Sequence, residues 1–191
     1  MSNIQKNFLS KLHNWVNQLE GDGKHPAFAS ELSIVEQAFR YVNKELEINN
    51  PKFLDIGSAT GNILYAAKEI FGKEGQYCGI EHNKTYAAIA NSIDHKFNVF
   101  IIDMFSKLSI EQMKDADIIY TYVPVGGQDL VKLYKLISLK AKNGAIIILN
   151  DTNMRSEYFS VNTIIKPLKR FTGSDCCNQT DITVYQKNKI I

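Results

Sequence analysis

The sequence is poor in cysteine and proline, and it lacks any long apolar run. It has 3 cysteines and 4 prolines among 191 residues. An odd number of cysteines that includes an adjacent pair, Cys176 and Cys177, gives no disulfide framework or zinc spacing and is typical of a reducing compartment. No run approaches the roughly 20 apolar residues that span a bilayer, and the first residues lack the apolar core of a signal peptide. We expect a cytoplasmic protein without a membrane partner.

Two further scarcities limit the kinds of site. The 4 histidines form no H-x-x-x-H pair, so we expect no metal site. The net charge is only +2, and it is unevenly spread, because residues 132–191 carry ten Lys or Arg against four Asp or Glu. This segment could face a nucleic acid, but a solvated surface is the simpler interpretation.

The spacing of apolar residues predicts two helices before the first strand. A helix over residues 5–19 is predicted by the helical recurrence of Phe8, Leu12, Trp15, Val16 and Leu19. A second helix is predicted over 33–47, where Ser33 and Glu36 form an S-x-x-E pattern typical of a capping box. We therefore expect a helical extension over residues 1–50.

From Pro51 onward, short apolar runs alternate with helix-like stretches. The runs lie at 53–56, 76–80, 98–102, 117–123 and 145–149, and the helix-like stretches at 61–71, 84–92 and 127–140. Apolar strands joined by helical crossovers form parallel sheets that are covered on both faces. The segment 181–187 alternates instead, which predicts an antiparallel strand paired near 168–172. We expect a single α/β domain over 1–191, with a doubly wound, mostly parallel sheet and a C-terminal hairpin in its core over 51–191.

The first predicted strand ends in a turn of small residues. The stretch "FLDIGSATGN" places Gly57, Ala59 and Gly61 at alternate positions behind Asp55. Such a turn lets a ligand approach the backbone, and the helix after it offers N–H groups to an anion. A dinucleotide G-x-G-x-x-G site would need its third glycine where Asn62 stands. The spacing resembles the D-x-G-x-G-x-G first motif of class I S-adenosylmethionine (SAM)-dependent methyltransferases, with Ala59 in place of the middle glycine.

The resemblance implies a Rossmann-like fold with SAM as the cofactor, and it covers residues 33–150. It implies that the turn from Gly57 to Asn62, including Ser58, cradles the methionine portion of SAM. It also implies that Asp55 orders the turn or receives the methionine amine.

Two further acids extend the resemblance, because each ends the next predicted strand in turn. Glu81 follows "QYCGI", and the family implies that it accepts both ribose hydroxyls. Asp103 follows "NVFII", and the family implies that it accepts from the adenine amino group while Met104 packs on the ring. His82 would line the adenosine pocket. Any one of these acids alone could instead be an exposed loop acid or a helix cap.

The fourth predicted strand bears on the methyl acceptor. Its stretch "DADIIYTYVPVGGQD" lacks the Asn/Asp/Ser-Pro-Pro-aromatic tetrad of nucleic-acid amino methylases. The stretch "ILNDTN" after the fifth strand has Asn150 before Asp151, the reverse of the order in metal-dependent O-methylases. Alternation places Tyr120 and Tyr122 on one side of the strand. They form either part of the core or aromatic walls that hold an amine near the cofactor.

We expect a methyltransferase with Tyr120 at the cofactor and Tyr122 as the candidate catalytic residue. The strand motifs "GIE" and "ADIIYTYV" loosely resemble small lysine methyltransferases, so a protein side-chain amine is slightly favoured as acceptor over a small molecule or RNA. A phenol, Asp151 or water could take the proton of the amine. A non-catalytic module of the same fold and a nucleotide-dependent oxidoreductase are the alternatives, and the sequence predicts no oligomeric state.

One connecting segment has two interpretations. The stretch "GDGKHPAFAS", residues 21–30, contains two glycines and a proline between the predicted helices. It is either a plain connector or a mobile loop that folds over the cofactor with Phe28 or His25 facing the ligand.

Overall fold

The computed structural model describes residues 2–19, 32–122, 125–151, 164–174 and 179–188. The helices are α1 (Asn3–Leu19), α2 (Leu32–Glu45), α3 (Asn62–Phe71), α4 (Lys84–Ile93), α5 (Lys107–Asp115) and α6 (Gly127–Lys140). The strands are β1 (Lys52–Ile56), β2 (Gln76–Glu81), β3 (Phe97–Ile101), β4 (Ile118–Tyr122), β5 (Ile146–Asp151), β6 (Ile165–Ser174) and β7 (Gln179–Lys187).

All the described strands join one sheet in the order β3-β2-β1-β4-β5-β7-β6. Strands β1 to β5 pair in parallel, whereas β7 pairs antiparallel with both β5 and β6. The predicted doubly wound sheet with an antiparallel C-terminal hairpin is therefore confirmed. The strand order reverses between β1 and β4, which is the switch point where open α/β sheets bind ligands beyond the carboxyl ends of their strands.

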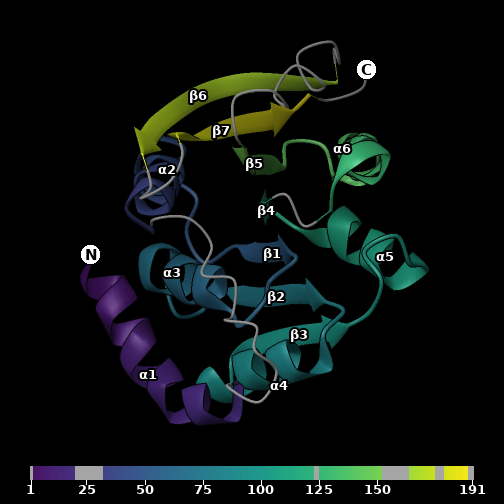
Figure 1. The fold of residues 1–191 in the computed structure, drawn as a ribbon. Coiled ribbons are helices and arrows are strands. Elements are labelled where there is room, and N and C mark those ends of the chain that lie inside the picture. The colour runs from purple at the N-terminus through teal and green to yellow at the C-terminus, as the bar shows by residue number, and fades with distance from the viewer. Residues whose placement is uncertain (1, 20–31, 123–124, 152–163, 175–178, 189–191) are drawn as a thin grey trace.

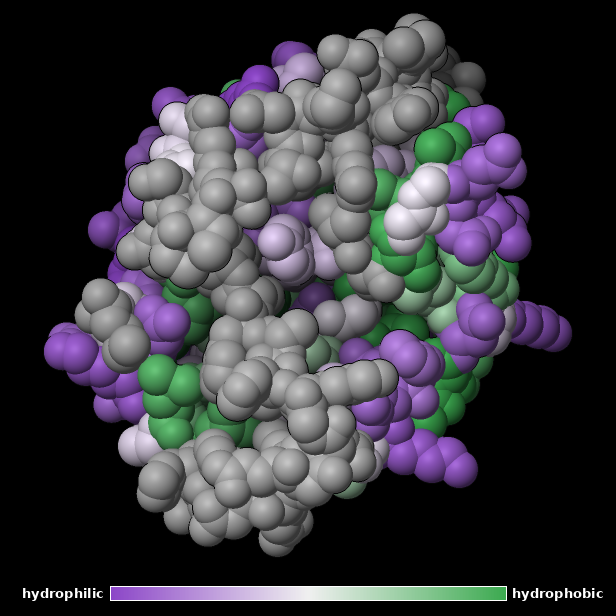
Figure 2. Space-filling view, viewed as in Figure 1, coloured by the Kyte–Doolittle hydropathy of each residue, from purple (hydrophilic) through white to green (hydrophobic). Residues whose placement is uncertain are grey.

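Two helical layers cover the two faces of the sheet (Figure 1). On one face, α1 to α4 pack on side chains such as Phe53 of β1, and on the other, α5 and α6 pack on Leu54 and Ile56. Because successive side chains of a strand point to opposite faces, apolar residues at consecutive positions of β1 serve both layers. Figure 2 shows hydrophilic side chains over much of the described surface on one side of the molecule, with smaller hydrophobic areas between them.

The structure departs from the sequence predictions at two helices. Helix α5 was not predicted, and its buried side chains are only Ser109 and Met113, so its apolar periodicity is weak. The predicted capping box at the start of α2 is wrong. The Glu36 carboxylate accepts a hydrogen bond from Ser2 and lies 3.8 Å from the Arg40 guanidinium, so it joins the start of α1 to α2.

Among the described residues, no helix is both long and apolar enough to cross a bilayer.

Candidate functional site

The turn between β1 and α3 adopts an alternating left-handed backbone. Gly57, Ala59 and Gly61 have φ angles of 83°, 45° and 85°. Glycine adopts such angles without strain, whereas Ala59 does so at a cost of about 1–2 kcal/mol. The N–H groups of Gly57 and Ser58 donate to the Ile80 carbonyl at 2.9 and 3.1 Å, so the turn is fastened to the end of β2.

Two glycines make room for this turn. A Cβ atom at Gly61 would lie 3.0 Å from the Ala90 Cβ of α4, so the glycine lets α3 begin close against α4. A Cβ atom at Gly79 of β2 would collide with the Ser58 side chain, so this glycine lets Ser58 fold beneath the turn. An isolated glycine inside a strand signals such a close approach. The "CGIE" stretch therefore contained a signal that the sequence prediction did not use.

Asp55 is the most unusual side chain of the site. It is only 2% exposed, and its Oδ2 atom has no hydrogen-bond partner among the described residues. Burial, followed by the negative charge of Glu81, raises the pKa of Asp55 well above its ordinary value. The Oγ atom of Ser58, which is 1% exposed, likewise has no partner in the described part of the chain. Since buried polar atoms nearly always have partners, Asp55 and Ser58 are candidate ligand-binding groups.

Glu81 lies at the end of β2 in a fixed orientation. Its Oε2 accepts the Ala59 N–H at 3.0 Å, and its Oε1 accepts the Asn83 N–H at 2.8 Å. A carboxylate has about four acceptor positions, so these two bonds orient Glu81 while leaving acceptor capacity for a ligand. His82 lies beside it, with Nδ1 3.2 Å from Glu81 Oε1, but its side chain is 88% exposed. His82 is therefore at the rim of the site.

The sequence prediction overlooked Asn83. Its side-chain oxygen accepts from the N–H groups of Thr85 and Tyr86 at 2.9 and 3.3 Å, which makes Asn83 the N-cap of α4. Asparagine immediately before a helix is a recognised capping signal. This residue fixes both the start of α4 and, through its own N–H, the orientation of Glu81.

Asp103 and Met104 occupy the turn after β3. Asp103 is exposed, and its Oδ1 accepts the Phe105 N–H at 2.6 Å, which occupies one of its two carboxylate oxygens. Met104 is half-buried against the core layer of α5 and α6. The Lys132 ammonium of α6 lies 4.3 Å from the centre of the Phe105 ring, so a cation–π contact holds this turn against α6.

The two strand tyrosines have different environments. Tyr120 is fully buried, and its hydroxyl accepts a hydrogen bond from Asn150 Nδ2 at 2.9 Å. Its ring packs edge-on against the Phe39 ring, with 5.8 Å between the ring centroids. This placement favours the core interpretation of Tyr120 over an open pocket wall. Tyr122 ends β4, is half-buried, and lies opposite Asn150 in the register with β5. Of the two, Tyr122 is the one that is partly exposed.

No protein-family model and no curated protein matches the sequence, but solved structures match its fold. An O-methyltransferase from Bacillus cereus in complex with SAH matches with a TM-score of 0.64 at 13% identity, covering 94% of this chain and 91% of that one. An O-methyltransferase from Streptomyces achromogenes in complex with SAM matches with a TM-score of 0.65 at 9% identity, covering 99% and 91%. The magnesium protoporphyrin IX methyltransferase of Synechocystis with bound SAM matches with a TM-score of 0.65 at 10% identity, covering 82% and 79%. The chain has the class I methyltransferase fold.

Within this methyltransferase fold, the predicted residues fall into groups. The turn from Gly57 to Asn62 is joined to Ile80 and Glu81 at the carboxyl end of β2 by the hydrogen bonds described above, and Asp55 lies in β1 just before this turn. Asp103 follows the neighbouring strand β3. The predicted loop over residues 21–30 lies outside the described residues, and so does the side chain of Asp151.

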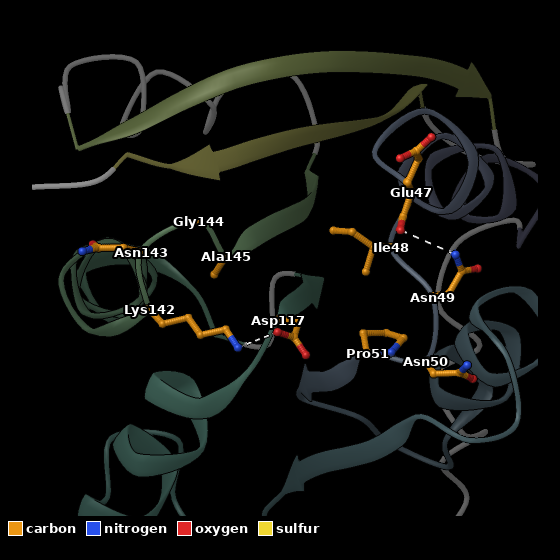
Figure 3. A pocket seen from close by; sticks show the side chains of 10 residues that line it. All are labelled: Glu47, Ile48, Asn49, Asn50, Pro51, Asp117, Lys142, Asn143, Gly144 and Ala145. Carbon is orange, nitrogen blue, oxygen red and sulfur yellow. Dashed lines mark hydrogen bonds and ion pairs between the residues drawn. The ribbon is translucent and has the colours of Figure 1, made fainter.

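A cavity of about 370 Å³ lies at the opposite end of the sheet (Figure 3). Its lining comprises Glu47, Ile48, Asn49, Asn50, Pro51, Asp117, Lys142, Asn143, Gly144 and Ala145. Lys142 and Asp117 point toward one another and form an ion pair, and the Lys52 N–H donates to the second Asp117 oxygen at 2.8 Å. These charged groups have partners, and the cavity is at the amino ends of β1, β4 and β5. In methyltransferase-like sheets the carboxyl ends bind ligands, so the candidate site is the Asp55 region.

Proposed function

We propose that the protein transfers the methyl group of SAM, which binds across the carboxyl ends of β1, β2 and β3. The observation that carries this proposal is the pair of buried, unpartnered atoms, Asp55 Oδ2 and Ser58 Oγ, at the strand end where this fold binds ligands. A buried polar atom without a partner costs about 1–3 kcal/mol. A polar ligand that supplies partners therefore gains affinity there.

The groups around the turn match the charges of SAM. The methionine carboxylate suits the N–H groups at the start of α3, whose first turn contains no acidic residue. The ribose hydroxyls suit the Glu81 carboxylate, which the Ala59 and Asn83 N–H groups already orient. The adenine amino group suits Asp103, with Met104 as an apolar contact.

We further propose a protein side-chain amine as the methyl acceptor. Tyr122 supports this choice, because it is half-buried at the end of β4, next to β1 in the sheet, and an aromatic ring can bind a cationic amine. A small molecule and RNA are the competing acceptors. SAM supplies a methyl group already activated by the positive sulfur, so the contribution of the chain is proximity and alignment of the acceptor.

Binding of the cofactor tests the first part of the proposal. In calorimetry with SAM and NAD in parallel, we expect stoichiometric binding of SAM and none of NAD. SAM at a hundredfold excess over its dissociation constant should also stabilise the fold by about 2.7 kcal/mol. Protection by NAD but not by SAM would contradict the motif assignment.

Methyl transfer tests the second part. Protein, small-molecule and RNA fractions of a cell extract are each incubated with methyl-labelled SAM and the purified chain. We expect label in protein, at a base-resistant side-chain amine. Label in another fraction would change the acceptor class, and SAM binding with no transfer to any fraction would indicate a binding module. The proposed compartment is the cytoplasm, which the cysteine content supports.

A further inference from the structure

Asp55 carries an ionisable group in surroundings that offer no compensating charge. In the sheet register it lies between Gly79 of β2 and Tyr120 of β4, neither of which is charged at neutral pH. Its one charged neighbour among the described residues is Glu81, which has the same sign. Two negative charges near one another in a buried site raise the free energy of the ionised state.

Two cations on the covering helices, Lys68 and Arg40, form ion pairs with other acids, and Lys6, Lys44 and Lys84 of these helices are exposed. Lys68 of α3 forms a largely buried ion pair with Asp94, in which the two side chains are 11% and 7% exposed. Arg40 of α2 lies 3.8 Å from Glu36. Burial and Glu81 together raise the pKa of Asp55, in agreement with this geometry. A buried carboxylate with no cation lowers its free energy by taking a proton.

We propose that Asp55 holds a proton in the ligand-free protein and exchanges it for a cationic group of the ligand, so that the site selects amine-bearing ligands over neutral ones. This inference rests on the proposed function, because the ligand that it concerns is SAM. In the exchange, the carboxyl group of Asp55 releases its proton to solvent, and the carboxylate that forms pairs with the methionine ammonium. No bond of the ligand is broken.

The exchange makes binding depend on both pH and ligand charge. Below the folded pKa of Asp55, each bound SAM should release about one proton, and its affinity should rise about tenfold per pH unit. Above that pKa the carboxylate is already ionised, so both effects disappear. 5′-Methylthioadenosine has no amino-acid portion, so it should bind without releasing a proton. Comparing the two ligands separates the binding of the adenosine portion by Glu81 and Asp103 from the recognition of the ammonium group by Asp55.

Calorimetry in two buffers of different ionisation enthalpy measures the released proton directly. The expected result is proton release with SAM, declining toward alkaline pH, and none with 5′-methylthioadenosine at any pH. If SAM does not bind at all, the proposed function fails with this inference. If SAM binds without proton release from about pH 5 to about pH 8, the inference alone is overturned.

Two variants sharpen the assignment. Asp55→Asn should bind SAM at least about tenfold more weakly and without proton release or pH dependence. The control variant is Asp129→Asn, which removes an exposed acid in the first turn of α6 at the same end of the sheet. It should release as many protons on SAM binding as the wild type. Release that persists in Asp55→Asn would assign the proton to another group. The wild-type measurement decides the question if Asp55→Asn does not fold.

The ligand-free melting temperature gives a readout that is independent of binding. A carboxyl group whose folded pKa is raised stabilises the fold below its ordinary value of 3.8, and this contribution is lost as pH rises through the folded pKa. Asp55→Asn should therefore melt higher than wild type near neutral pH, and the difference should shrink in acid. A lower melting temperature of Asp55→Asn at every pH would contradict a proton-holding Asp55.

Discussion

Two aspartates on neighbouring strands show how differently the two ends of the sheet are built. Asp117 precedes β4 at the amino end, where one oxygen accepts the Lys52 N–H and the other pairs with Lys142. Burial alone would raise the pKa of Asp117, but the bonds from Lys142 and Lys52 outweigh it and hold the pKa below its ordinary value. Asp55 at the carboxyl end has no such donor in the part of the chain that the structure describes, and burial raises its pKa. The Asp117 carboxylate at the amino end is paired on both oxygens, whereas the carboxyl end has buried acceptor atoms without a partner among the described residues.

Two glycines repeat this contrast in the backbone. Gly57 at the carboxyl end has a φ of 83°, and Gly144 at the amino end has a φ of 84°. Gly144 has open space around the position of a Cβ atom, whereas Gly57 lies in the turn of the candidate site, next to Ser58 and two residues after Asp55. Because the two glycines have nearly equal φ angles at opposite ends of the sheet, the same substitution at each separates the effect on folding from the effect on binding.

The largest expected effect is that of Gly57→Val, compared with Gly144→Val. Each substitution forces a β-branched residue into a left-handed conformation at a cost of about 1–2 kcal/mol. We expect both variants to lose similar thermal stability, but Gly57→Val alone should weaken SAM binding, by more than about a hundredfold. Melting curves and calorimetry on the two proteins measure this. Normal SAM affinity in folded Gly57→Val would show that the ligand does not approach the turn.

A smaller effect is expected for Glu81→Ala. The change removes the proposed acceptor of the ribose hydroxyls and leaves the Ala59 and Asn83 N–H groups without it. The dissociation constant of SAM should rise by about tenfold to a hundredfold, corresponding to about 1–3 kcal/mol. Glu74→Ala is the matched control, since Glu74 is exposed at the amino end, 3.5 Å from Lys96. Equal SAM affinity in the two variants would remove Glu81 from the site.

The smallest effect is expected for Lys142→Met at the amino end. The Lys142 and Asp117 side chains are 38% and 39% exposed, so breaking this pair should cost about 1 kcal/mol or less and leave SAM affinity unchanged. A depressed folded pKa contributes stability above the ordinary aspartate value of 3.8, which is lost as pH falls through the lowered pKa. The melting temperatures of the variant and wild type should therefore converge in acid. Lys135→Met, which changes an exposed residue of α6, is the control. If the melting temperatures of Lys142→Met and wild type differ equally at every pH, loss of the Asp117 ion pair is not the cause.

The sequence predicted the parts of the fold that depend on local pattern. Continuous apolar runs predicted the buried parallel strands, the alternation of 181–187 predicted β7, and the small residues after the first strand predicted a turn there. The capping box of Ser33 and Glu36 failed, because the partner of Glu36 is Ser2, which lies immediately before α1. No local pattern can report such a distant contact.

The positions of the candidate acids along the strands were predictable from the sequence, but their electrostatics were not. The order of Asp55, Glu81 and Asp103 at successive strand ends followed from the sequence. The missing partner of Asp55 did not, because it depends on which groups β2, β4 and the covering helices bring near it. Tyr120 and Tyr122 were equivalent in the alternation pattern, and only the bond from Asn150 and the packing on Phe39 distinguish them.

The insertion of β7 between β5 and β6 has a consequence for the order of folding. Until β7 is synthesised, the apolar strand β5 has an open edge, since its neighbours in the finished sheet are β4 and β7. An open apolar edge can pair with another chain and aggregate. The β6–β7 hairpin is local and can form in about 1–10 μs, so it can dock on β5 as a preformed unit. A nascent chain that stalls on the ribosome before Gln179 would therefore depend on a chaperone to cover β5.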